Sequence, residues 1–203
     1  MRRSASAPLA LYALVIALGV AEKLVPQLRV PFPAPPAYRP ALYALGVLGS
    51  AEAVWAAAIA YAAYSYIRWR RLPAALLASL LLAEVLDGIL KVSFSVCRPL
   101  ESCPPYRILM VDSYSYPSGH STRTFSIPLT VRDEVARWAL FAFAAAVAVS
   151  RVLIEVHYPL DVVGGAFLGL ASSLVAGQLV RRLRLHELEA GAGERLEQGP
   201  GYP

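Results

Sequence analysis

The sequence has 203 residues, of which 57% are hydrophobic, and its mean hydropathy is +0.51. A water-soluble domain of this length is rarely so apolar, and the apolar residues fall into long runs, a pattern typical of membrane helices. The formal net charge of +5 comes from short arginine clusters between these runs, which argues against a basic stripe for nucleic acid. We therefore expect an all-α integral membrane domain over residues 1–185, followed by a polar, disordered tail over 186–203.

Six apolar stretches predict six membrane-spanning helices. In chain order their approximate limits are residues 9–25, 41–67, 73–96, 120–137, 135–154 and 160–180. The fourth stretch is the weakest, because only its TFSIPLTV portion is free of charge and Pro128 interrupts it. A proline-rich connector, residues 26–40, separates the first stretch from the second. Short loops elsewhere favour antiparallel neighbours, so we expect a compact six-helix bundle.

The arginine clusters also predict how this bundle is oriented. They occupy residues 2–3, 68–71, 132–137 and 181–184. All four lie in the cytoplasm if the chain crosses the membrane six times, since cytoplasmic loops are enriched in arginine and lysine. Both termini are then cytoplasmic, and the loops that carry His120 and His157 face outward. This arrangement requires the fourth stretch to cross the membrane, because otherwise the loops of His120 and His157 would lie on opposite sides.

The first polar motif is KVSFSVCRP, in which Lys91 and Arg98 are seven residues apart. On a helix this separation is about two turns, so we expect both cations on one face, close to the point where Pro99 stops the helix. An interfacial pair of snorkelling side chains is the alternative. The scarcity of lysine in the chain and the position of the proline favour a functional pair.

The second motif is YPSGH, residues 116–120, which combines turn residues with a histidine. Ser118 is expected to cap the helix that follows, Gly119 lets backbone N–H groups approach an anion, and His120 falls in the first helical turn. Taken alone, this pattern more often marks an ordinary helix start than an active site.

The third motif is SRVLIEVHYPLD, residues 150–161, in which Arg151 closes the fifth span. Pro159 is expected at the first position of the sixth helix, with His157 just before the helix and Asp161 in its first turn. Asp161 can then accept a hydrogen bond from one imidazole nitrogen and leave the other free to attack. For this motif in isolation, a capped helix with a surface histidine is an equal alternative.

Together the motifs contain two histidines, three cations, a serine and a glycine at the outer ends of helices three to six, a set that suits a tetrahedral oxyanion. Their order and spacing resemble those of the type 2 phosphatidic acid phosphatases, also called lipid phosphate phosphatases. That pattern is K-x6-RP, then PSGH, then SR-x5-H-x3-D, and every defining position is matched between residues 91 and 161. The six-span layout extends the resemblance over about residues 8–183.

The resemblance implies a metal-independent phosphatase that works through a phosphohistidine. It makes His157 the nucleophile, Asp161 its orienting carboxylate, and His120 the proton donor to the leaving oxygen. The phosphate-binding groups that it implies are Lys91, Arg98, Ser118, Gly119 and Arg151. The residues by themselves leave open which histidine attacks. No cofactor or metal is expected, because no carboxylate cluster stands near these residues to hold magnesium.

The expected partner is a lipid phosphate or diphosphate in the membrane. A polyprenyl (di)phosphate is favoured, since recycling such a carrier needs an outward-facing site, while phosphatidate and phosphatidylglycerophosphate stay plausible. A phosphotransferase that uses a lipid or sugar hydroxyl in place of water is one alternative. A non-catalytic transporter or binding relative is another, although no substitution in the motifs points to it.

Two further features of the sequence are left with alternatives. Arg123, one turn after His120, is expected either to contact a second phosphate or, with more weight, to pair with Glu84 or Asp87. Cys97 and Cys103 flank Arg98 and its neighbours in a loop predicted to face outward, where a disulfide is permitted and is slightly favoured over two thiols.

Overall fold

The computed structural model describes residues 6–25, 32–99 and 113–197, with side chains up to residue 183. Within these ranges the chain is helical apart from its connections, and one isolated antiparallel bridge joins Cys97 to Tyr114. The elements are α1 (Ser6–Leu24), η2 (Pro36–Tyr38), α2 (Arg39–Leu48), α3 (Ala51–Trp69), α4 (Ala74–Phe94), α5 (Gly119–Phe125), η4 (Pro128–Thr130), α6 (Glu134–Leu153) and α7 (Pro159–Glu197).

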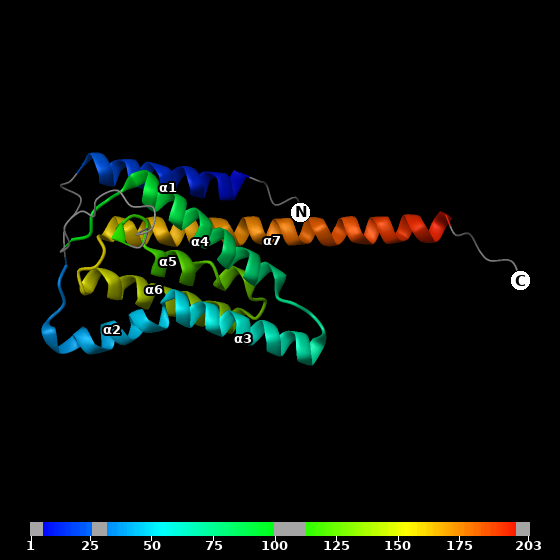
Figure 1. Ribbon diagram of the computed structural model, residues 1–203, viewed down its shortest axis with the longest axis horizontal. Coiled ribbons are helices and arrows are strands. Elements are labelled where there is room, and N and C mark those ends of the chain that lie inside the picture. The colour runs from blue at the N-terminus through cyan, green and yellow to red at the C-terminus, as the bar shows by residue number, and fades with distance from the viewer. Residues whose placement is uncertain (1–5, 26–31, 100–112, 198–203) are drawn as a thin grey trace, which may run out of the picture.

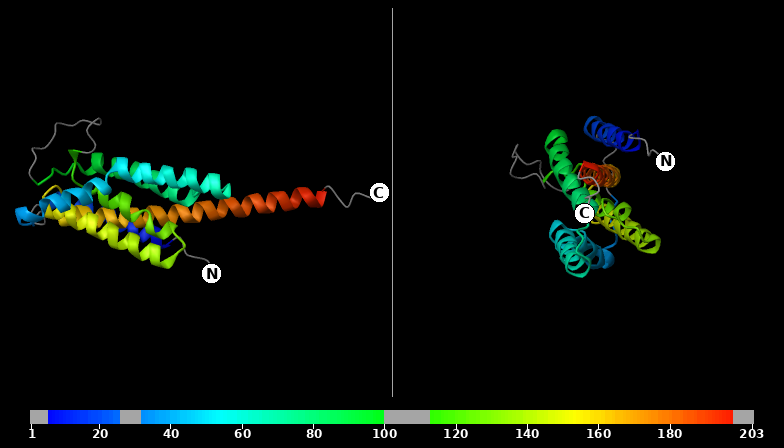
Figure 2. Two further views of the ribbon diagram at one scale, coloured as in Figure 1. Left: turned by 90° about the horizontal axis from the view of Figure 1, so that it is seen from below. Right: turned by 90° about the vertical axis from the view of Figure 1, so that its right-hand side faces the viewer.

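The helices form an elongated bundle with α7 at its centre. Helices α1, α4 and α5 pack against α7, while α6 packs against α2 and α5 (Figure 1). Figure 2 shows in its end-on view that the other helices surround α7, and in its view from below that α7 continues well past them. With the bent pair α2 and α3 running in one general direction, the chain otherwise reverses along the long axis from helix to helix, so the connections that carry the motifs gather at one end of the bundle (Figure 1).

Several helix starts are set by local sequence. Ser50 precedes α3 and its side chain accepts a hydrogen bond from Ala53 N at 3.3 Å, and Asp133 does the same for α6 with Ala136 N at 2.7 Å. Such caps satisfy backbone donors that a helix leaves unpaired at its N-terminus. The longest helix, α7, begins at Pro159, the position predicted from the sequence.

The second apolar stretch is not the single helix that we expected over residues 41–67. It is divided into α2 and α3, which are bent by 46° at Gly49 and Ser50. The break has two causes, one local and one from packing. Ser50 caps a new helix, and Gly49 lets the chain approach α6 so closely that a β-carbon there would lie 2.5 Å from Val147 Cγ1.

The ends of two other predicted spans also differ from expectation. Helix α4 ends at Phe94 because Ser95 adopts a left-handed conformation with φ 51°, so Arg98 lies beyond the helix and not on one helical face with Lys91. The fourth stretch contains only the seven-residue α5 and the short η4. At 1.5 Å per residue, α5 rises roughly 10 Å, which is too short to cross a bilayer as one helix.

The hydropathy of the described helices supports a membrane protein. Three helical segments are long and apolar enough to cross a membrane, namely Ser6–Leu24, Glu134–Leu153 and Pro159–Leu183, and the bent pair α2 and α3 makes a fourth if it counts as one span. The count of six crossings therefore stays a prediction. Helix α7 runs on to Glu197, through most of the segment that we expected to be an irregular tail.

Candidate active site

A cavity of about 210 Å³ lies where the connections of the bundle converge. The residues that line it are Ser50, Ala51, Glu52, Lys91, Arg98, Gly119, His120, Arg123 and His157. All three motifs contribute to this list, although they are far apart in the chain. The break between α2 and α3 contributes the first three residues, which sequence reasoning did not assign to the site.

His157 lies in the connection between α6 and α7 and is 2% exposed. Its Nδ1 is 3.2 Å from Asp161 Oδ2, one helical turn later in the first turn of α7. The same carboxylate oxygen accepts a hydrogen bond from Tyr158 N at 2.7 Å. The His157 main chain is held in turn by a hydrogen bond from its N–H to Arg151 O at 3.3 Å. The nucleophile predicted by the resemblance is therefore buried and oriented.

Burial determines the resting charge of His157. Removal from water lowers the pKa of His157 to about 4, against the opposing effect of the Asp161 carboxylate beside it. The imidazole is then neutral at pH 7. With Nδ1 directed at the carboxylate, the other ring nitrogen carries the lone pair that a nucleophile needs.

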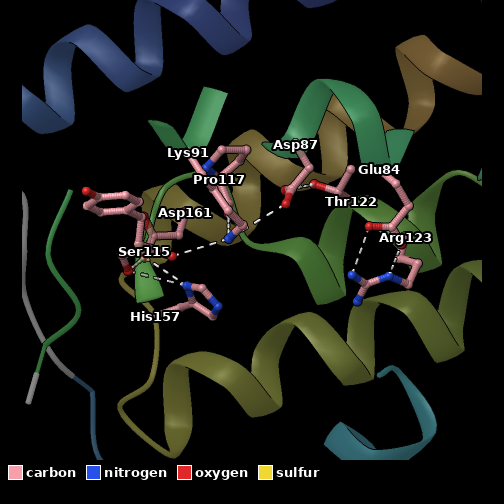
Figure 3. Close-up of polar contacts among 10 residues, drawn as sticks. Glu84, Asp87, Lys91, Ser115, Pro117, Thr122, Arg123, His157 and Asp161 are labelled. Atoms are coloured by element: carbon pink, nitrogen blue, oxygen red, sulfur yellow. Dashed lines mark hydrogen bonds and ion pairs between the residues drawn. The ribbon is translucent and has the colours of Figure 1, made fainter. Parts of the chain in front are cut away.

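Ser115 is a residue of the site that the sequence analysis missed. Its hydroxyl donates a short hydrogen bond to Asp161 Oδ2 and lies 3.3 Å from His157 Nδ1 (Figure 3). Ser115 sits two residues before Pro117, outside the PSGH motif, so no spacing rule singled it out. Its proximity to His157 depends on the packing of two segments about 40 residues apart in the chain.

The PSGH segment begins α5 as predicted, but its serine does not cap the helix. Ser118 occupies the N-cap position, yet its side chain makes no capping hydrogen bond, and the buried hydroxyl has no hydrogen-bond partner among the described residues. Ser118 N instead donates to Asp161 O at 3.0 Å, which joins the start of α5 to the start of α7. His120 lies in the first turn of α5 and lines the cavity.

Lys91 is almost fully buried at the end of α4, with 1% of its surface exposed. Its Nζ donates to Pro117 O at 2.8 Å and to Tyr114 O at 3.2 Å, and lies 3.7 Å from Asp87 Oδ2 (Figure 3). Lys91 therefore holds the segment before α5 in place as well as lining the cavity. Arg98 reaches the same cavity from the connection after α4.

Arg151 is buried near the end of α6 but does not line the cavity. Its Nη2 donates to Leu42 O at 3.0 Å and its Nε to Ser150 Oγ at 3.2 Å. Its guanidinium packs directly against Gly46 of α2. Its charge is close enough to act on His120. Arg151 and Ser118 are thus the two predicted phosphate ligands that are not among the residues lining the cavity.

Arg123 lines the cavity and forms a two-pronged ion pair with Glu84 of α4. Its Nη2 donates to Glu84 Oε2 at 3.0 Å, and its Nε forms a shorter bond to Oε1 (Figure 3). Trp55 of α3 donates to the same carboxylate at 3.3 Å. Asp87, the other predicted partner, accepts from Thr122 Oγ1 at 3.2 Å.

Cys97 is disulfide-bonded, and it lies directly before Arg98. The sequence contains one further cysteine, Cys103, which lies outside the described residues. Within the described part of the chain, no three His, Cys, Asp or Glu side chains are grouped so that they could hold a metal ion. Three cations, Lys91, Arg98 and Arg123, line the cavity against one carboxylate, Glu52, and this excess of positive charge suits an anionic ligand.

Comparison with known proteins gives the family to which this fold belongs. A model of the PAP2 superfamily matches residues 72–185, more than half of the chain. The protein belongs to the PAP2 superfamily.

Three curated relatives are similar to this chain, two of them named as phosphatases and one as a transport permease. An undecaprenyl-diphosphatase of Sulfolobus acidocaldarius is 33% identical over 117 residues, which are 55% of this chain and 57% of that protein. The bacitracin transport permease protein BcrC of Bacillus licheniformis is 32% identical over 57% of this chain and 59% of its own length. A probable lipid phosphate phosphatase beta of Arabidopsis thaliana is 30% identical over 57% of this chain and 67% of its own. The matched region thus spans less than two thirds of the first two relatives.

Two solved structures share the fold. The PAP2 type phosphatidylglycerolphosphate phosphatase of Bacillus subtilis has a TM-score of 0.69 at 18% identity, with 86% of this chain and 96% of that chain covered. LpxE of Aquifex aeolicus has a TM-score of 0.58 at 20% identity, with 82% and 94% covered. At these identities the likeness concerns the fold.

Proposed function

We propose that this protein is an integral membrane lipid phosphatase that hydrolyses a lipid phosphate or diphosphate monoester through a phosphohistidine, without a metal ion. The observation that carries the proposal is the buried pair of His157 and Asp161 at 3.2 Å, placed beside a cavity that Lys91 and Arg98 line. A neutral, oriented imidazole next to fixed positive charge is what attack on a phosphate requires.

In the first step, the free ring nitrogen of His157 attacks phosphorus and the bond from phosphorus to the leaving oxygen breaks. His120, which is protonated in the substrate complex beside the anionic phosphate, gives this proton to the leaving oxygen, and the lipid product leaves. In the second step, His120 takes a proton from water, the oxygen of that water attacks phosphorus, and the phosphorus–nitrogen bond breaks. Inorganic phosphate is released and His157 is restored. Microscopic reversibility gives His120 both proton transfers.

The phosphoryl oxygens would be held by the cations and donors of the three motifs. Lys91, Arg98 and the Gly119 backbone line the cavity, and the hydroxyl of Ser118, the residue before Gly119, is buried without a hydrogen-bond partner among the described residues. Arg151 would stabilise the negative charge of the phosphoryl oxygens from outside the lining of the cavity. These groups neutralise charge that becomes concentrated on the oxygens in the transition state, which lowers the barrier.

The favoured substrate is a polyprenyl phosphate or diphosphate. The support is the similarity to a protein named undecaprenyl-diphosphatase, at 33% identity over the matched region. We further propose six crossings, with α5, η4 and the residues up to α6 making the fourth, both termini in the cytoplasm and the cavity facing outward. The arginine clusters support this orientation, since they then all lie on the cytoplasmic side.

The proposal is tested by phosphate release from the purified full-length protein in detergent, with excess chelator. The substrates are polyprenyl monophosphate, polyprenyl diphosphate, phosphatidate and phosphatidylglycerophosphate. His157→Ala is the test variant, and His186→Ala, a histidine outside the three motifs, is its matched control. We expect release by the wild type and by His186→Ala, a loss of release in His157→Ala, and the highest kcat/KM with a polyprenyl substrate.

Three alternative outcomes of this experiment would each contradict a different part of the proposal. A folded wild-type protein that releases no phosphate from any of the four substrates rejects hydrolysis. Release that disappears with chelator and returns with a divalent ion rejects metal independence. Preference for phosphatidate or phosphatidylglycerophosphate rejects the polyprenyl assignment while leaving the phosphatase reaction in place.

A further inference from the structure

We propose that Ser115 is a positioning residue that holds the Asp161 carboxylate, and through it His157, in the orientation needed for attack on phosphorus. The inference deepens the proposed function and rests on it. Ser115 lies outside all three motifs, and its hydroxyl is the third member of a buried group that also contains His157 and Asp161.

Three donors converge on one oxygen of Asp161. The Ser115 hydroxyl donates to Oδ2, and His157 Nδ1 lies 3.2 Å from the same atom (Figure 3). Tyr158 N also donates to Oδ2, at 2.7 Å. Oδ1 has no hydrogen-bond partner among the described residues. The orientation of the carboxylate is therefore set entirely through Oδ2, where Ser115 supplies one of two donors besides the imidazole.

The Ser115 hydroxyl also favours one tautomer of His157, the one protonated at Nδ1. Because Ser115 gives its single hydrogen to Asp161, the lone pairs of its oxygen are available to Nδ1, which is 3.3 Å away. Both neighbours of Nδ1 are then acceptors, so the proton of the neutral imidazole sits on Nδ1. The other ring nitrogen is left unprotonated and able to attack.

The main chain gives this hydroxyl a fixed position. Ser115 N donates to Val96 O at 2.7 Å, next to the bridge between Cys97 and Tyr114. Ser115 itself is fully buried, and it does not line the cavity. It therefore has no direct access to a substrate, so its effect on the reaction passes through Asp161 and His157.

The test compares Ser115→Ala and Ser115→Thr with a matched control, Ser172→Ala. Ser172 is equally buried, and its hydroxyl donates to Leu168 O at 2.8 Å within α7. Phosphate release is measured on the full-length protein with the substrate that the wild type hydrolyses best. We expect kcat of Ser115→Ala to fall roughly tenfold to a hundredfold with KM within about twofold, since a charge-assisted hydrogen bond is lost but no phosphate ligand is. Ser115→Thr recovers most of kcat, and Ser172→Ala matches the wild type.

The pH profile separates positioning from a structural effect. His157 faces Asp161 of α7, Lys91 of α4, Arg98 of the following connection and His120 of α5. Of these, Ser115 bonds to the Asp161 carboxylate. Without the serine donor, Oδ2 pairs more strongly with a protonated imidazole, so the acid limb of kcat/KM moves to higher pH in Ser115→Ala. Ser115→Thr keeps the wild-type limb.

Two results overturn the inference while the wild type is active. One is a Ser115→Ala variant with wild-type kcat. The other is an equal loss in the alanine and threonine variants with an unmoved acid limb, which indicates a packing role. An inactive wild type instead rejects the proposed function, and this inference falls with it.

Discussion

Gly46 of α2 lies directly against the guanidinium of Arg151 on α6. A β-carbon placed on Gly46 would come within 1.8 Å of Arg151 Nη2. The same Nη2 donates to Leu42 O, also on α2, at 3.0 Å. A helix outside the three motifs therefore determines where one of their cations lies.

Gly46→Ala is predicted to displace Arg151 and to lower phosphate release. A methyl group at 1.8 Å from a guanidinium cannot be accommodated, so the side chain must leave its hydrogen bond to Leu42 O. We expect kcat/KM to fall roughly tenfold to a hundredfold, the range for loss of a charged hydrogen bond. Steady-state phosphate release measures it.

Gly177→Ala is the matched control for this change. It is another helical glycine beside an arginine, but a β-carbon there would lie 3.6 Å from Arg181 Nη1, an ordinary contact. Activity should match the wild type, and stability should be equal or higher because alanine is the better helix former. Equal activity in Gly46→Ala and Gly177→Ala would show that the position of Arg151 does not matter for turnover.

Asp161→Asn is predicted to lower kcat by roughly 10²–10⁴-fold with little change in KM. An amide in place of the carboxylate no longer holds the Nδ1 proton or stabilises the charged phosphohistidine. Asp133→Asn is the matched control, because asparagine caps α6 as well as aspartate does. Single-turnover phosphate release with both variants checks the prediction, and comparable rates would argue against an orienting role.

The stability of the protein is predicted to fall as the pH drops from about 6.5 to about 4. Burial lowers the pKa of His157 to about 4 in the folded state, from an ordinary value of 6.5. Between these values the unfolded chain binds a proton at this histidine and the folded protein does not, so protonation favours unfolding. Above pH 6.5 this contribution is absent.

Thermal unfolding in detergent across this pH range tests the idea, with His157→Gln as the comparison. The glutamine variant cannot titrate at this position, so its melting temperature should decline less steeply than that of the wild type between pH 6.5 and pH 4. Parallel curves would show that His157 does not carry the acid sensitivity.

Removing the charge of Glu84 is predicted to destabilise the fold by about 1–3 kcal/mol, since it removes the carboxylate that accepts two hydrogen bonds from buried Arg123. The Glu84 side chain is 27% exposed, so the expected loss of stability is smaller than for a fully buried ion pair. The double variant Glu84→Gln with Arg123→Gln should regain part of the loss. Denaturation of the two single variants and the double variant measures the coupling.

The same Arg123→Gln variant addresses its other interpretation. If Arg123 serves the fold, kcat/KM for polyprenyl monophosphate and diphosphate should change in the same proportion. A selective loss with the diphosphate would assign Arg123 to a second phosphate. Arg39→Gln, which breaks a pair with Glu155 at 3.2 Å in which the Arg39 side chain is 40% exposed, is the control and should cost less than about 1 kcal/mol.

Local patterns made several parts of this protein predictable. The start of α7 at Pro159 and the place of Asp161 in its first turn depend on residues within one turn of each other. The separation of His157 and Asp161, four residues apart, follows from the same short-range geometry. Membrane character follows from composition, because a bilayer requires long apolar helices regardless of how they pack.

Other expectations were wrong because they treated helices as continuous. Arg98 leaves α4 at the left-handed residue Ser95, and the second span breaks at Gly49 under the close approach of α6. Apolar periodicity does not reveal the left-handed conformation of Ser95 or the break at Gly49. The break at Gly49 depends on a neighbour almost 100 positions away, Val147.

The sequence by itself determined the membrane class, the family motifs and the residues that those motifs name. Tertiary structure alone brought Ser115 to the carboxylate of Asp161, set Gly46 against Arg151, and made the break between α2 and α3 a wall of the cavity. The physical reason is the separation in sequence between the residues that interact. Motif spacing records what the backbone imposes within a turn or two, whereas these contacts join segments about 40 to 110 residues apart and exist only once the helices have packed around α7.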